Sequence, residues 1–553
     1  MSGSLVGPEM FAAWAHRCFA RFWGFSDLIK SNLWLYIKNH KVNNHRAKKM
    51  LAGHIMLDRS SDDGLVRQLF GQIRQLIERG DLVAGFTLPS SRQLALALGV
   101  GRNTVVMAYE QLELEGYLQS DGRRGTCVSE ASRGFLGGAP DARDDVARVR
   151  TASAPRLSRQ ALQLMSVERR SLPTPSTFQP GLPDVRSFPH NLWGRMLRRA
   201  ARHLPLHPDM AGYAHYSGLP ALKQAILAHA AASRGVIAEV DQVMILSSAQ
   251  AALDLVARLL LNPGDMALHE EPGYGGMTAA LKGAEALCHP IAVHQQNSFS
   301  QLLDRLPEGA DPRLIYTTPS HQFPSGQVMA LQDRLALLSQ ADALGAFILE
   351  DDYDSEFHFS GAPISCLQGL DRRDVVIYMG TFSKSLMPSL HVAYLIVPKR
   401  LVAATQLSLR NVGAVPSVVV QQALADFMAD GHLRAHVREM NKLYHARRDA
   451  LVAGLNRHCR PFLAPVVPDG GIQLPAYFTE HALGRGFDDK TLVPLLRKDG
   501  VESSALSSLY WSSQSKGSSK VKQGLFLGYA ASNLEEIEAG VTRIATRLDA
   551  MAS

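Results

Sequence analysis

Apolar residues recur at two different spacings along the chain, and each spacing predicts a different kind of structure. Between residues 60 and 129 the spacing is helical. The first stripe consists of Leu65, Leu69, Ile73 and Ile77. We expect a second helix around residues 94–98, a third over about 102–115, and two short strands at 117–119 and 126–128 that flank a turn.

From about residue 176 onward, short apolar runs alternate with amphipathic stretches. The runs lie at 243–246, 314–317, 346–349, 375–378 and 393–397. Short strands that are apolar on both faces and separated by helices are typical of a parallel sheet covered on both sides. The sequence therefore predicts an α/β fold with a mainly parallel sheet.

Length and composition divide the chain into segments. A chain of 553 residues with 46% apolar and 20% charged residues is expected to fold into two or more ordinary globular domains. We place a helical domain at 56–130, a flexible basic linker rich in Ala, Arg, Ser and Pro at 131–175, and an α/β domain at 176–553. Residues 1–55 form a basic extension without an interpretable pattern. It is either the product of an early start assignment or an arm that touches membrane or nucleic acid.

The net charge of +7 does not by itself identify a DNA-binding part. Residues 1–50 contribute +6, whereas residues 56–129 sum to −1. The apolar-looking stretch 11–37 is interrupted by Arg17, Arg21, Asp27 and Lys30, which argues against a membrane span. Five scattered cysteines favour a reducing cytoplasm over disulfides or a metal site.

The helical segment has the layout of a winged helix-turn-helix, in which two helices joined by a short turn are followed by a hairpin. A plain three-helix bundle with a terminal hairpin has the same periodicity. Polar residues at the helix starts and the hairpin tip favour DNA binding, because arginines there reach bases and phosphates. The candidate DNA-binding residues are Ser90, Arg92, Arg102, Asn103, Thr104, Arg123 and Arg124. Residues 88–95, 98–105 and 109–118 together resemble the GntR class of bacterial regulators.

Lys384 and Asp351 are the candidate cofactor-site residues of the larger domain. Lys384 lies in a stretch of small and hydroxyl residues that directly follows the run 375–378, and it comes 33 positions after Asp351. Pyridoxal 5′-phosphate (PLP) requires a lysine amine that forms a Schiff base with its aldehyde and a carboxylate that keeps its pyridine nitrogen protonated. The pair therefore predicts a PLP site.

The larger segment resembles fold-type I aminotransferases, and the whole chain resembles the MocR family, in which a GntR-like head is joined to such a domain. The resemblance implies a smaller C-terminal α/β subdomain and a homodimer. It implies that Lys384 holds the cofactor, Asp351 pairs with its nitrogen, Tyr353 binds the ring hydroxyl and Tyr274 stacks on the ring. Phosphate ligands are implied at the helix start formed by Ser248, Ala249 and Gln250, and at Thr381. The loop 319–326 is implied to lie along the cofactor; otherwise it is a proline-rich turn.

Four positions depart from the family pattern, and two of them, Ser248 and Ala393, stand where a glycine is usual. His391 stands where an arginine usually clamps the phosphate, and it offers at most a weaker, pH-dependent contact. Phe526 stands where aminotransferases place the arginine that holds the substrate carboxylate. We therefore expect looser PLP binding and a sensor in place of a transaminase.

The expected function is a PLP-dependent, DNA-binding transcription regulator that senses PLP or an amine or amino-acid ligand and binds operator DNA as a homodimer. One alternative is an aminotransferase with an accessory DNA-binding head. Another is a degenerate regulator that no longer binds PLP.

Overall fold

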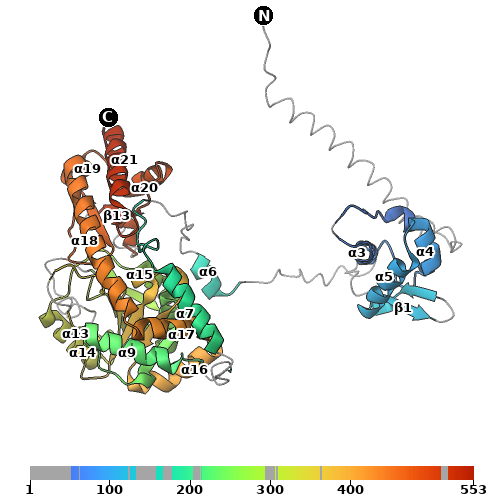
Figure 1. The fold of residues 1–553 in the computed structure, drawn as a ribbon, viewed down its shortest axis with the longest axis horizontal. Coiled ribbons are helices and arrows are strands. Elements are labelled where there is room, and N and C mark those ends of the chain that lie inside the picture. Colours follow the sequence, from blue (N-terminus) through green and yellow to red (C-terminus); the bar gives the residue numbers. More distant parts are fainter. Residues whose placement is uncertain are drawn as a thin grey trace, which may run out of the picture. The chain divides into compact units, whose positions relative to one another are not determined.

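Figure 1 shows the computed structural model of the chain. It describes residues 51–61, 63–121, 125–131, 157–165, 177–203, 212, 215–292, 306, 309–360, 364–511 and 521–553. The chain divides into two compact units, Met1–Ala154 and Pro155–Ser553, and each is described here by itself. A membrane crossing would need a longer and more apolar helix than any found within these described ranges.

The N-terminal unit contains the three predicted helices, α3 (Leu65–Glu78), α4 (Ser91–Leu98) and α5 (Arg102–Leu114). Their apolar stripes meet in one core. Gly99 adopts a left-handed conformation (φ 63°) that ends α4 and allows the tight turn into α5. β1 (Leu118–Asp121) and β2 (Gly125–Val128) form an antiparallel hairpin, and Thr87 bridges to Cys127 as a third strand position. This small sheet distinguishes the winged arrangement from a plain helical bundle with a terminal hairpin.

The second unit is built on a seven-stranded sheet in the order β3-β9-β8-β7-β6-β4-β5. Its strands are β3 (Val243–Leu246), β4 (Met266–Glu271), β5 (Leu287–Ala292), β6 (Pro312–Thr317), β7 (Phe347–Asp352), β8 (Val376–Thr381) and β9 (Ala393–Ile396). Only β9 runs antiparallel to its neighbours in this sheet. The predicted mainly parallel sheet is therefore confirmed.

Helices cover both faces of this sheet, as its doubly apolar strands require. Val243 and Ile245 of β3 face a core shared with α7 (His190–His203), α9 (Pro220–Arg234) and α17 (Val418–Ala429). Met244 and Leu246 face the opposite core, with α10 (Ala249–Leu260), α11 (Gly275–Gly283) and α16 (Val402–Val412). Alternate residues of one strand thus belong to different cores, which is why the run shows no polar alternation.

A smaller antiparallel sheet forms the C-terminal part, in the order β10-β11-β13-β12. Its strands are β10 (Leu463–Pro465), β11 (Gln473–Phe478), β12 (Ser504–Ala505) and β13 (Gly524–Gly528). It packs with α18 (His432–His458), α20 (Asp489–Lys498) and α21 (Leu534–Ala552) around one core. Further helices described in the second unit are α13 (Leu331–Leu344), α14 (Leu367–Leu370), α15 (Phe382–Ser385) and α19 (Glu480–Gly484). Short 3₁₀ turns lie at Val240–Gln242, Pro388–Leu390, Lys399–Leu401 and Leu506–Leu509.

The segment expected to be a flexible linker contains a short helix, α6 (Arg159–Met165). Gln160 Nε2 donates to the carbonyl of Gly283 at the end of α11 (2.5 Å), and Arg159 pairs with Glu285 (3.2 Å). Residues 157–165 of the predicted linker thus include a helix, which two polar contacts hold against the end of α11 and the residues that follow it. The rest of 131–175, apart from residue 131, lies outside the described residues, as does nearly all of the extension 1–55.

Candidate functional site

Lys384 lies on α15, directly after β8. The hydroxyl of Thr381 caps this helix by accepting from the amide of Ser383 (3.1 Å). Lys384 Nζ donates to the carbonyl of Gly181 (2.7 Å), and a Cβ atom at position 181 would lie 2.9 Å from that nitrogen. Burial lowers the pKa of Lys384, while the carboxylates of Asp354 and Asp351 oppose the shift. A larger fraction of this amine is therefore unprotonated, and nucleophilic, than in an exposed lysine.

Asp351 lies at the end of β7, next to β8, where it is paired in register with Met379. Its Oδ2 accepts a hydrogen bond from Tyr316 Oη (2.7 Å). Burial raises the pKa of Asp351 to about 7, and the Tyr316 hydrogen bond opposes that rise. A buried carboxylate with one hydrogen bond and a raised pKa suits a protonated ring nitrogen as its partner.

The neighbouring Asp352 has a different environment. Arg234 donates to it (2.8 Å) and Tyr378 Oη donates to the same oxygen (2.5 Å). Burial alone would raise the pKa of Asp352, but the Arg234 charge and the hydrogen bonds from Ser355, Tyr378 and Arg234 together outweigh it and hold the pKa below its usual value. Asp352 thus anchors the end of β7, and Asp351 is left as the carboxylate without a cationic partner among these contacts.

Aromatic rings line the space beside Asp351. Phe323 makes edge-to-face contacts with Tyr274 (centroids 5.8 Å apart), Tyr353 (6.1 Å) and Phe526 (5.1 Å). The ring of Tyr274 lies over Gly276, where a Cβ atom would come within 2.3 Å of it. Burial and the charge of Asp351 raise the pKa of Tyr274. Tyr274 and Tyr353, predicted separately from the sequence, therefore share one wall, with Phe323 between them.

The predicted phosphate ligands meet at one edge of the large sheet. Leu246 at the end of β3 pairs with Ala393 of β9, which pairs with Thr381 at the end of β8. This register brings Ser248 and Thr381 to the same edge, and His391 precedes β9 by two residues. Gln250 Nε2 donates to the carbonyl of Gly276 (2.9 Å), which ties the start of α10 to the Tyr274 segment.

Two of these side chains are already engaged. The hydroxyl of Ser248 accepts from the amide of Ala251 (3.0 Å) as the cap of α10, and Thr381 caps α15. Backbone amides of Ala249 and Gln250 belong to the first helical turn, where N–H groups lack intrahelical acceptors. His391 is exposed and has a left-handed backbone (φ 51°). The amides, more than the hydroxyls, are therefore the donors that suit an anion.

Most candidate DNA-binding residues lie at the starts of α4 and α5. Ser90 forms a capping box with Gln93, in which each side chain bonds the other's backbone amide (3.4 and 3.1 Å). Arg92, Arg102 and Asn103 are exposed, whereas Thr104 is half-buried. Ser90 therefore shapes the start of α4, and the three exposed side chains form the accessible surface. Arg123 and Arg124 lie outside the described residues.

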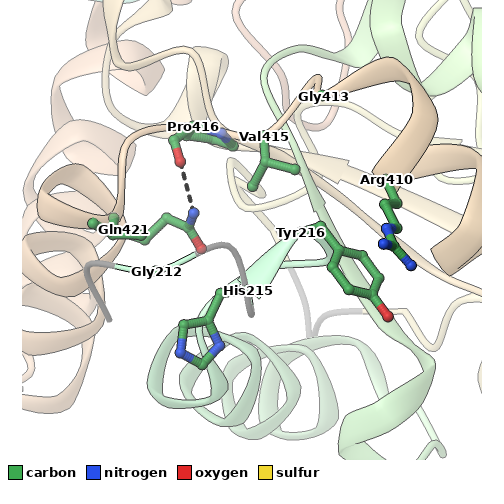
Figure 2. A pocket seen from close by; sticks show the side chains of 9 residues that line it. Gly212, His215, Tyr216, Arg410, Gly413, Val415, Pro416 and Gln421 are labelled. Carbon is green, nitrogen blue, oxygen red and sulfur yellow. Dashed lines mark hydrogen bonds between the residues drawn. The ribbon is translucent and has the colours of Figure 1, made fainter. Parts of the chain in front are cut away.

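A separate cavity of about 540 Å³ lies at the start of α17, near the C-terminal end of α16. Figure 2 shows the side chain of Gln421 turned toward Pro416, to whose carbonyl it donates (2.7 Å). The described residues around the cavity are Gly212, His215, Tyr216, Arg410, Gly413, Val415, Pro416, Val418 and Gln421. None of them was singled out from the sequence, and Lys384 is not among them. The Ser247 amide donates to Ala414 (3.0 Å), so this wall adjoins the start of α10.

Several residues of the candidate site were missed by the sequence reasoning. Tyr316 belongs to a predicted apolar strand, and only the pairing of β6 with β7 brings it to Asp351. Gly181 precedes the first helix of the domain and reaches Lys384 across 203 residues. Phe323 lies in the loop expected along the cofactor, but its central place among the aromatic rings was not anticipated.

Comparison with known proteins supplies the family. Residues 193–493 match the family described as aminotransferase class I and II, and residues 65–128 match the bacterial regulatory proteins of the gntR family. The chain is 38% identical to the "Probable rhizopine catabolism regulatory protein MocR" of Rhizobium meliloti, over 90% of this chain and 97% of that protein. The chain is a MocR-type regulator of the GntR family.

Other relatives agree with both halves of this MocR-type architecture. The pyridoxine biosynthesis transcriptional regulator PdxR of Corynebacterium glutamicum is 31% identical over 76% of this chain and 84% of its own length. The kynurenine aminotransferase of Pyrococcus horikoshii has a similar fold, with a TM-score of 0.60 and 25% identity over 73% of this chain and 97% of that protein. The fold-type I aminotransferase fold predicted for the second unit is thereby confirmed.

Proposed function

We propose that this MocR-type regulator binds PLP covalently through Lys384 and uses the occupancy of that site to control how its N-terminal unit binds operator DNA. The observation that carries the proposal is the convergence of a buried lysine amine and a buried carboxylate at the adjoining ends of β8 and β7. Neither the Lys384 amine nor the Asp351 carboxylate hydrogen-bonds to a charged group in the contacts described above, and leaving both without one would be costly in a site without a ligand.

The residues present fit this cofactor. Asp351 would hold the ring nitrogen, Tyr353 the ring hydroxyl and Tyr274 one face of the ring. The amides at the start of α10 would hold the phosphate. When bound, the cofactor supplies an aldehyde that captures primary amines. The protein's part is to increase the unprotonated fraction of Lys384 by burial and to hold Gly181 close to that amine.

Operator binding is assigned to the exposed side chains at the starts of α4 and α5. Arg102 and Asn103 lie at the N-terminus of α5, which is the end that a recognition helix presents to base edges. We propose that the protein acts in the cytoplasm as a homodimer, because a two-fold pair of heads matches a pair of operator half-sites. PLP, or an amine that reacts with it, controls DNA binding only if its affinity differs between arrangements of the heads.

An enzymatic role is the second candidate, and one observation weighs against it. Phe526 is 2% exposed and packs with Leu506 and Leu509 at the position where an aminotransferase arginine is expected. A phenyl ring cannot pair with a carboxylate. Steady turnover with an amino-acid donor and a keto-acid acceptor would nonetheless establish the enzyme.

Two measurements test the proposal together. Addition of PLP to the purified protein should produce a visible absorption band that Lys384→Ala lacks, whereas Lys399→Ala, which changes an exposed lysine, should retain it. A gel shift on the protein's own upstream region should then change with PLP for the wild type but not for Lys384→Ala. Cofactor capture without any change in DNA binding would leave the sensor function unsupported.

A further inference from the structure

Phe526, on β13 of the smaller sheet, is linked through one neighbouring residue to the reactive lysine on α15. On β11 and β13, Gln473 pairs with Gly528 and Pro475 pairs with Phe526, so Gln473 and Phe526 share one face of the smaller sheet. A Cβ atom at Gly181 would lie 2.9 Å from Lys384 Nζ and 4.0 Å from Gln473 Oε1. Gln473 therefore adjoins the lysine, and Phe526 is its diagonal neighbour.

The wall around Phe526 is apolar. Leu506, Leu509 and Phe526 form one buried cluster, against which Phe323 and Tyr477 pack. Phe323 in turn contacts Tyr353 and Tyr274. Apolar contacts thus connect the proposed cofactor wall to Phe526.

Two arginines of the C-terminal part are neutralised by carboxylates: Arg447 pairs with Asp184 (2.9 Å), and Arg448 pairs with Asp449 (2.7 Å). Lys522 is exposed, with its ammonium 5.4 Å from the centroid of the Tyr477 ring. Because Tyr477 packs against the Phe526 cluster, Lys522 is a candidate partner for a ligand carboxylate.

Gln473 is a polar residue at this wall, and it interacts with Tyr353. Burial raises the pKa of Tyr353, and the hydrogen bond with Gln473 opposes that rise. A carboxamide can bond to a hydroxyl or an amide but cannot neutralise a carboxylate. Moving a carboxylate against this wall would leave its charge unpaired, which is far more costly than burying an apolar group there.

We infer that the site selects apolar primary amines that lack a carboxylate on the amine-bearing carbon, such as arylalkylamines, and that Phe526 sets this preference against α-amino acids. The inference rests on the proposed function and gives its ligand class. With the cofactor bound, an incoming amine would replace Lys384 on the cofactor's aldehyde carbon. The protons that the incoming nitrogen loses would pass to the released Lys384 amine, so the exchange would need no oxidant.

Phenethylamine and phenylalanine are the probes, because they differ only by the carboxylate. Both are titrated into the PLP-loaded, full-length protein, with the absorption change and the heat of binding as readouts and affinities expressed per unprotonated amine. We expect phenethylamine to bind at least tenfold more tightly. Phe526→Arg should reverse the order, Phe526→Leu should keep it, and Val467→Arg, which adds the same charge at an exposed position, should leave it unchanged.

Equal or tighter binding of phenylalanine by the wild type would overturn the inference. If Lys522→Met then removed that binding, the carboxylate anchor would be Lys522. A Phe526→Arg variant that loses its PLP band reports only a disturbed fold, and the wild-type pair then decides alone. Failure of the wild type to capture PLP would instead refute the proposed function, and it is recognised before any amine is added.

Discussion

Asp351→Asn distinguishes two effects of the buried Asp351 charge: the stability that it costs the PLP-free protein, and the binding that it contributes when PLP is present. Asparagine keeps the shape of the side chain and an oxygen that can accept the hydrogen bond from Tyr316. It removes a negative charge that has no cationic partner among the contacts described for it. We therefore expect the substitution to stabilise the protein in the absence of PLP and to weaken its response to PLP.

The pKa of Asp351 gives the size of this effect. Burial raises it from the ordinary value of 3.8 to about 7. Each pKa unit corresponds to about 1.4 kcal/mol, so ionising this group at pH 8 costs the folded state up to about 4 kcal/mol. Because the pKa of Asp351 is higher in the folded protein than in the unfolded chain, protonation of this carboxyl favours the folded state. That stabilisation is fully present below pH 3.8 and is lost as the pH rises through about 7.

Calorimetric melting of the PLP-free protein at pH 5 and pH 8 measures the effect. The Asn variant should be the more stable at pH 8, and its advantage should shrink by roughly 2–3 kcal/mol at pH 5. Asp254→Asn is the matched control: its carboxylate is 42% exposed and pairs with Arg258 (2.7 Å), and such pairs contribute about 0.3–0.5 kcal/mol. PLP should raise the melting temperature of the wild type more than that of Asp351→Asn.

An Asn variant that is less stable than the wild type at both pH values, without PLP, would refute this reasoning. Contacts beyond the Tyr316 hydrogen bond would then stabilise the Asp351 charge in the PLP-free protein. The uncompensated charge of Asp351 would no longer support its assignment as the partner of the ring nitrogen.

Three further predictions concern the DNA-binding surface and the predicted phosphate ligands at the edge of the large sheet. Arg102→Ala should weaken operator binding by about 1–3 kcal/mol in a fluorescence anisotropy titration while the PLP absorption band stays unchanged; unaltered operator affinity would show that the start of α5 does not contact bases. Ser90→Ala should destabilise the N-terminal unit by about 1 kcal/mol in thermal melting through loss of the capping box, whereas Ser90→Asp should largely retain it. His391→Arg should tighten PLP binding, and an affinity equal to that of the wild type would remove this position from the phosphate site.

The sequence predicted those parts of the fold that depend on local pattern. The apolar stripe from Leu65 to Ile77 and the turn at Gly99 determine helices and their ends within a few residues, so the winged head could be anticipated. The doubly apolar runs equally predicted a covered sheet. The strand order could not be predicted, because pairing of β3 with β9 joins residues about 150 positions apart and leaves no periodic signal.

The sequence predicted those site residues whose own functional group suggests their role. It missed the residues that belong to the site only through their contacts in the folded protein. Lys384 and Asp351 stand out by type and position. Tyr316, Gly181 and Phe323 are ordinary residues of a strand, a turn and a loop until the fold brings them beside those two groups. The helix α6 was missed because its seven residues are too few to show a helical repeat, and long-range contacts with Gly283 and Glu285 hold it in place.

Mass spectrometry after hydride reduction tests the central claim most directly. The PLP-loaded protein is reduced, digested with trypsin and mapped. Capture at Lys384 blocks cleavage there, so the account predicts a single modified peptide that spans residues 374–399 and carries the reduced cofactor. An unmodified peptide that ends at Lys384, or cofactor found on another lysine, would contradict the assignment of this amine as the PLP-binding group.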